Sequence, residues 1–129
     1  MVRRVTLDSG VVSALAEGDA RARANLEAFR RRDVEVIVPA VVIAESTTGV
    51  GPRDARVNTV LSGCRIAPAT EAIARRAAQL RFTARRPDAT IDAIVVATAD
   101  LVGGRALLTR DLDDCGALAR STDVRVQSP

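Results

Sequence analysis

Four acidic residues of this 129-residue chain stand inside or directly after apolar segments: Asp8, Glu45, Asp92 and Asp111. Carboxylates that cluster repel one another and raise each other's pKa, so a cluster of them is costly unless a cation neutralises it. Hard divalent ions such as Mg²⁺ or Mn²⁺ bind oxygen ligands and suit that need. Such ions commonly align a phosphate, activate water and stabilise a leaving oxygen. If the fold brings these acids to one cleft, the chemistry they favour is metal-assisted displacement at phosphorus.

The rest of the composition narrows the chemistry further. The chain has no histidine, and all 19 of its basic residues are arginine. These absences exclude Ser–His–Asp and Cys–His nucleophiles and histidine zinc sites. They also exclude the lysines of P-loops, Schiff bases and kinases. Carboxylates, hydroxyls, arginines or a bound metal must therefore carry any catalysis.

Each acid also has a purely structural interpretation. Asp8 or Ser9 could cap a helix, and the helix dipole would favour Asp92 in a first turn. Asp111 and Asp114 have the spacing of a capping pair, and the lone glutamate could point to solvent. The joint pattern favours the metal site, because three separate segments bring an acid to the same predicted sheet edge.

Short apolar strands alternate with helices along the whole chain. The predicted strands are 5–7, 34–38, 64–67, 105–108 and 124–126, and the predicted helices begin after residue 8 and span 19–31, 40–45, 52–61, 71–85, 91–101 and 111–120. Pro39 is expected in a first helical turn, and Pro87 is expected to end the longest helix. The alternation predicts a single α/β domain, residues 1–129, built as a three-layer α/β/α sandwich with a mainly parallel sheet. Ligands of such sheets collect at the carboxyl ends of the strands.

The net charge and the cysteine content restrict the possible partners and the cellular compartment only weakly. The formal net charge of +3 permits nucleic-acid binding without requiring it. Cys64 and Cys115 lack CxxC spacing and are interpreted as reduced, buried thiols. Neither a signal peptide nor an apolar run long enough to span a membrane is evident. We therefore expect a soluble protein of the cytoplasm with no membrane partner.

Four segments, taken in order, resemble the motifs of PIN-domain proteins: Val5–Val12, Pro39–Glu45, Thr90–Ala99 and Leu107–Asp114. Together they cover essentially the whole chain. A bare PIN domain of this length most resembles the VapC toxins of VapBC toxin–antitoxin pairs. The resemblance implies a Mg²⁺- or Mn²⁺-dependent endoribonuclease that hydrolyses RNA phosphodiester bonds with activated water.

The same resemblance implies roles for individual residues. An acidic quartet would hold the metal and carry catalysis, and it matches Asp8, Glu45, Asp92 and Asp111. Asp114 matches a further acid that would support these ligands or belong to a second metal position. Thr109 matches a hydroxyl residue that supports the site, and Ser9 would orient the first acid.

Two positions depart from the family pattern. Cys115 stands where many members carry an aromatic residue, a change expected to affect packing more than catalysis. Asp88 adds an acid one turn before the third motif, and the neighbouring Pro87 favours an exposed loop there.

The resemblance also implies three partners: an RNA substrate, a VapB-like antitoxin whose C-terminal segment covers the acidic cleft, and a second copy in a homodimer. Candidate phosphate contacts are Arg30–Arg32, Arg75, Arg76, Arg81, Arg85 and Arg86, although most are expected to be ordinary solvated helix faces. With two phenylalanines and neither Trp nor Tyr, base stacking is expected to be nearly unavailable. Recognition should therefore rest on phosphates, backbone groups and RNA shape.

Three other functions would also use acids that follow short strands. A phosphatase with an aspartate nucleophile would want a second acid where this chain has Gly10, and it normally uses a lysine. A phosphoacceptor receiver domain needs adjacent acids early in the chain and a lysine late in it, and this chain has no lysine. The alternative that remains is a non-catalytic PIN-like module that binds RNA or protein.

Overall fold

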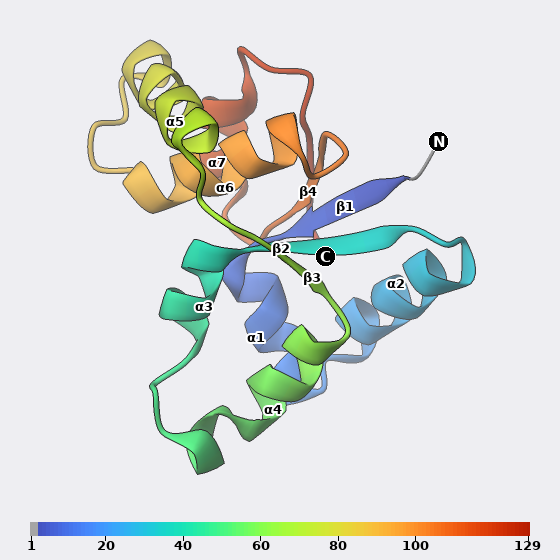
Figure 1. Ribbon diagram of the computed structural model, residues 1–129. Helices are drawn as coiled ribbons and strands as arrows, with labels where there is room; N and C mark the ends of the chain where they lie inside the picture. The colour runs from blue at the N-terminus through green and yellow to red at the C-terminus, as the bar shows by residue number, and fades with distance from the viewer. Residues whose placement is uncertain (1–2) are drawn as a thin grey trace.

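The computed structural model describes residues 3–129 and contains a five-stranded sheet between two layers of helices (Figure 1). The strands are β1 (Arg4–Leu7), β2 (Glu35–Pro39), β3 (Arg65–Ala67), β4 (Ala106–Leu108) and β5 (Arg125–Gln127). Their order is β3-β2-β1-β4-β5, and every neighbouring pair is parallel. The predicted α/β sandwich is thus confirmed, and the sheet of the described residues is wholly parallel.

The helices are α1 (Ser9–Glu17), α2 (Ala20–Arg31), α3 (Ala40–Ser46), α4 (Gly51–Ser62), α5 (Glu71–Ala84), α6 (Thr90–Leu101) and α7 (Leu112–Ala119). Helices α1 to α4 lie on one face of the sheet and α5 to α7 on the other (Figure 1). No helix within residues 3–129 is long and apolar enough to cross a membrane.

The strand order reverses beside the central strand β1. The chain passes from β1 outward to β2 and β3, and then returns to place β4 on the other side of β1. In an open parallel sheet this reversal leaves a crevice at the carboxyl ends of the two strands that flank it. The residues that follow β1 and β4 therefore occupy the place where this fold binds ligands.

Apolar residues fill both faces of the sheet. Val36, Ile37 and Val38 in β2 are all buried, the near-continuous pattern expected of a strand covered on two sides. Helix α6 is buried over most of its length. Its buried Thr98 hydroxyl has a hydrogen-bond partner within the helix, because it donates to the carbonyl of Ile94 at 2.7 Å. This burial packs α6 against the sheet and thereby sets the position of its first turn, which carries Asp92.

Three element boundaries differ from those predicted. Pro39 ends β2 and caps α3 instead of lying in its first turn. Helix α5 ends at Ala84 because Arg85 adopts the left-handed conformation, with φ 55°, so Pro87 is not what stops it. Thr90 is already the first residue of α6.

A tight turn at Gly104 connects α6 with β4. Its φ is +79°, and a Cβ at this position would lie 2.1 Å from the carbonyl oxygen of Arg4. We expect Gly104→Ala to lower the free energy of unfolding by about 1–3 kcal/mol, because alanine would be strained there and would push against β1. Urea denaturation measures this loss. Gly116→Ala is the matched control, since a Cβ there meets nothing within 4 Å, and equal unfolding midpoints for the two variants would contradict the prediction.

Candidate metal centre

Asp8 is held at the carboxyl end of the central strand. Its backbone N–H donates to the carbonyl of Leu108 at 3.0 Å, which extends the pairing of β1 with β4. One carboxylate oxygen accepts from the backbone N–H of Ser9 and the other from the Thr109 hydroxyl, each at 2.7 Å. With 5% of its surface exposed, the carboxylate has one fixed orientation. Ser9 orients Asp8 through its backbone.

Thr109 connects the ends of the two strands. Its buried hydroxyl donates to Asp8 and accepts from the backbone N–H of Asp111 at 3.0 Å. One side chain therefore sets the positions of acids that are distant in sequence. Thr109 stands beside the acids as the sequence led us to expect.

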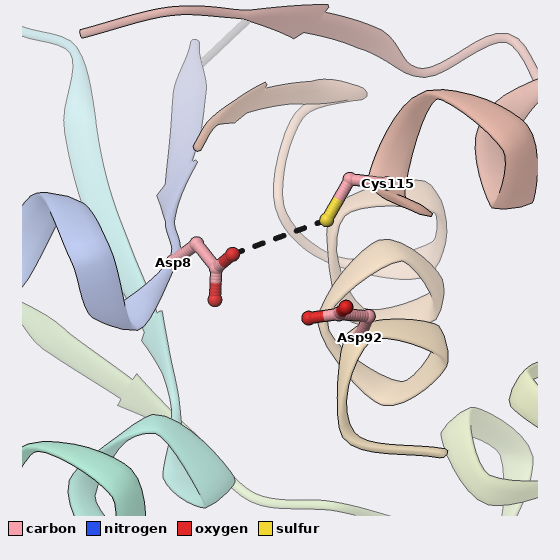
Figure 2. Close-up of side chains that lie close together, drawn as sticks. All are labelled: Asp8, Asp92 and Cys115. Atoms are coloured by element: carbon pink, nitrogen blue, oxygen red, sulfur yellow. Dashed lines mark hydrogen bonds between the residues drawn. The ribbon is translucent and has the colours of Figure 1, made fainter. Parts of the chain in front are cut away.

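Asp92 faces these residues from the first turn of α6. In Figure 2, Asp8, Asp92 and Cys115 point toward one another, Asp8 from the residue after β1 and the other two from α6 and α7. One ligand atom from each of these three lies within 4.8 Å of the others. Asp92 also belongs to a second such group, formed with Asp111 and Asp114. Asp92 is therefore the residue that joins the two groups.

Asp111 and Asp114 take part in a helix cap and also belong to the acidic cluster. Asp111 caps α7 by accepting from the backbone N–H of Asp114 at 3.1 Å. Arg86, from the turn after α5, donates to the Asp114 carboxylate and lies 3.7 Å from that of Asp113. The capping interaction holds the two acids near Asp92, and a guanidinium partly balances their charge at the rim.

Glu45 lies beside Asp8 but belongs to neither group. It is an exposed residue near the end of α3. Partial burial and the charge of Asp8 raise its pKa, while a hydrogen bond with Ser9 opposes that rise. The structure therefore brings together four of the five acids predicted to bind metal and leaves Glu45 at the edge.

The acids of the cluster strongly affect one another. Burial, followed by repulsion from Asp8 and Asp111, raises the pKa of Asp92 to about 7. Burial and the same kind of repulsion, from Asp8 and Asp92, also raise the pKa of the Cys115 thiol. A divalent cation would reverse the shift at Asp92 by pairing with the carboxylate form. The donors that face the crevice are mainly carboxylate oxygens, which fit Mg²⁺ or Mn²⁺.

Two contacts of the site were not evident in the sequence. Cys115 is fully buried, and its Sγ lies 3.9 Å from a carboxylate oxygen of Asp8, so it forms part of the wall of the site (Figure 2). Arg86 reaches the acids although 28 residues separate it from Asp114. No local spacing signals either contact, because both depend on how α5 and α7 pack.

A hollow of about 390 Å³ opens at the acids and is lined in part by Asp92, Asp114, Arg85 and Arg86. Its size is within the range usual for ligand sites. Asp88 also lines it, as the exposed turn residue that the sequence led us to expect. The hollow thus presents carboxylates and arginines side by side.

The other candidate arginines are placed less favourably. Arg75 pairs with Glu71 on the surface of α5, and Arg76 pairs with Asp100. The run Arg30–Arg32 lies at the end of α2, on the face of the sheet that is opposite to α5, α6 and α7 (Figure 1). Of the candidate arginines, only Arg85 and Arg86, in the turn between α5 and α6, line the hollow together with the acids.

Comparison with known proteins finds relatives of this fold. The family model described as PIN domain matches residues 5–119. A chain of a toxin–antitoxin complex from Klebsiella pneumoniae superposes with a TM-score of 0.69 at 26% identity, covering 85% of this chain and 88% of that one. A chain of FitAB bound to an IR36 DNA fragment gives 0.72 at 25% identity, over 97% and 94%.

VapBC2 from Rickettsia felis, bound to a DNA fragment from its promoter, gives a TM-score of 0.74 over 100% of this chain and 99% of that one. Its 13% identity shows a shared fold alone. Among curated proteins, none matches the chain significantly. A family model that covers most of the chain, together with acids gathered at the strand reversal, leads to one conclusion: the chain belongs to the PIN-domain family.

Proposed function

We propose that this protein is a metal-dependent endoribonuclease and the toxin of a toxin–antitoxin pair. The observation that carries the proposal is the position of Asp92. Its carboxylate belongs to two groups of side chains that are close enough to bind one metal ion, the first with Asp8 and Cys115 and the second with Asp111 and Asp114. Membership of the PIN-domain family supports a nuclease. The neighbour at 26% identity, a chain of a toxin–antitoxin complex, supports the toxin assignment.

Mg²⁺ or Mn²⁺ would be held by Asp8, Asp92 and Asp111, with Asp114 as a further ligand and Glu45 contributing from the edge. When bound, the ion supplies a Lewis acid for the phosphate and a lowered pKa for water. The chain itself fixes the ligands. Thr109 and the Ser9 N–H hold Asp8 in one orientation, and Asp111 is held by its capping bond.

The same proposal includes the partners. A VapB-like antitoxin would cover the acidic hollow, and the contact of Arg86 with Asp114 supports a guanidinium as a fitting group at its rim. We also propose a homodimer, which light scattering of the purified chain would detect. The protein would act in the cytoplasm, in keeping with its two free cysteines.

The alternative is a PIN-like module that binds RNA or protein without cleaving. Incubating the purified, antitoxin-free chain with labelled RNA distinguishes the two. We expect cleavage with Mg²⁺ or Mn²⁺, none in EDTA, and recovery when excess ion is restored, because the acids need a cation to act. If the chain bound RNA but did not cleave it with either Mg²⁺ or Mn²⁺, the non-catalytic module would be the correct interpretation. Mapping the cleaved sites in total RNA would then identify the substrate.

A further inference from the structure

Phe82 is an aromatic side chain that the fold leaves in water. It lies on α5 with 87% of its surface exposed, whereas Phe29, the other phenylalanine of the chain, packs against the core. Exposing a whole aromatic ring forgoes the free energy of burying it. The ring therefore contributes little to the stability of the isolated chain, and it is available to a ligand.

The surface around Phe82 adjoins the metal centre. The hollow beside Phe82 shares two lining residues, Arg85 and Pro87, with the hollow that holds Asp92 and Asp114. The two hollows therefore meet along the turn from α5 to α6. An extended ligand at the acids could continue across this turn onto the ring.

The cations next to the ring have no acidic partner. Neither Arg81 nor Arg85 has a carboxylate within 4 Å in residues 3–129, whereas Arg75 and Arg76 of the same helix are both paired. Arg81 donates to the Thr90 hydroxyl at 2.6 Å, which holds it between α5 and α6. Arg85 ends α5 with φ 55°, a position where glycine is usual. Two guanidiniums, neither of them paired with a carboxylate of residues 3–129, thus flank an exposed ring.

We propose that Phe82, Arg81 and Arg85 form a nucleotide subsite for the substrate strand. An unpaired base would stack on the Phe82 ring, and the adjoining phosphate would contact Arg85. Aromatic stacking beside arginines is the chemistry by which proteins hold single-stranded nucleic acid, largely without regard to sequence. The inference rests on the proposed ribonuclease function, because the subsite would hold the strand that is cleaved at the acids.

The first test is cleavage of a short unstructured RNA by Phe82→Leu and Phe82→Tyr. We expect Phe82→Leu to raise KM about tenfold or more with kcat within about twofold, because leucine is apolar but cannot stack. Phe82→Tyr should behave as wild type. Leu101→Ala is the control, since Leu101 is an exposed apolar residue at the far end of α6. Unchanged urea midpoints would show that the variants are folded.

The second test uses the absence of tryptophan from the natural chain. Phe82→Trp, combined with Asp92→Asn to prevent cleavage, places a single fluorophore at the subsite. Its emission should be quenched as RNA binds, whereas that of Leu101→Trp in the same background should not.

The outcomes separate this inference from the proposed function. If the wild type cleaves RNA while Phe82→Leu keeps its KM and Phe82→Trp is not quenched, the subsite is wrong and the ribonuclease stands. If Phe82→Leu weakens antitoxin binding alone, this face belongs to a protein partner and the subsite is again wrong. If the wild type cleaves no RNA, both proposals fail.

Discussion

Replacing Asp92 by asparagine should abolish metal-dependent RNA cleavage and at the same time stabilise the metal-free protein. Asp92 is the one residue present in both candidate metal-binding groups, so the amide would remove a charged ligand from each. A metal ion contributes several kcal/mol of charge stabilisation to such a transition state. At 1.36 kcal/mol for each factor of ten, kcat/KM should fall about a thousandfold.

The gain in stability follows from the pKa of Asp92. Its folded-state pKa, about 7, is raised above the value near 3.8 of an unperturbed aspartate, so the folded chain binds this proton more tightly than the unfolded chain. The resulting stabilisation is complete below the unfolded pKa and is lost as the pH rises through 7. As the pH is raised from 5 to 7.5 in EDTA, the Tm of the wild type should therefore fall relative to that of Asp92→Asn.

Thermal unfolding at several pH values with and without Mg²⁺ measures the effect. Mg²⁺ should raise the Tm of the wild type at pH 7.5 and leave Asp92→Asn almost unchanged. Asp123→Asn is the control, because Asp123 is an exposed carboxylate after α7 and belongs to neither group. Retention of metal-dependent cleavage by Asp92→Asn would contradict the proposed site.

Thr109→Val should weaken both the fold and the metal centre. Valine has nearly the same shape, so the change removes the hydroxyl without opening a cavity. Asp8 would lose one of its donors and the Asp111 N–H would lose its acceptor, both at the buried Thr109 side chain. A polar group left unpaired in this way costs about 1–3 kcal/mol of unfolding free energy. Loss of such a support for a metal ligand typically costs about 10–100-fold in affinity or activity.

Titration with Mn²⁺, cleavage rates and urea denaturation together test this prediction. Thr109→Ser should restore most of the activity, because it keeps the hydroxyl. Thr98→Val is the matched control: Thr98 is just as buried, but its hydroxyl serves only the carbonyl of Ile94 within α6. Equal losses of activity in Thr109→Val and Thr98→Val would show that Thr109 has no specific part in the site.

The elements were predictable because their signals are local. Asp19 and Thr70 cap α2 and α5 through side-chain bonds to nearby N–H groups, as their types suggest. The β-branched run before Pro39 forms a buried strand. Boundaries were harder to predict where the chain departs from residue preferences. Arg85 takes a left-handed conformation usually reserved for glycine, and helix α5 ends there before proline can act.

The sequence by itself determined that carboxylates, hydroxyls, arginines or a bound metal must carry any catalysis, and that Asp8 and Asp111 follow strands of a parallel sheet. Parallel strands carry their carboxyl ends to one edge, so these two could be assigned a common location from strand order alone. Only the tertiary structure decided that Asp92 joins both groups, that Glu45 stays at the rim and that Arg86 reaches Asp114. Those positions depend on how α3, α5, α6 and α7 pack on the sheet, and spacing along the chain does not encode distances between packed helices.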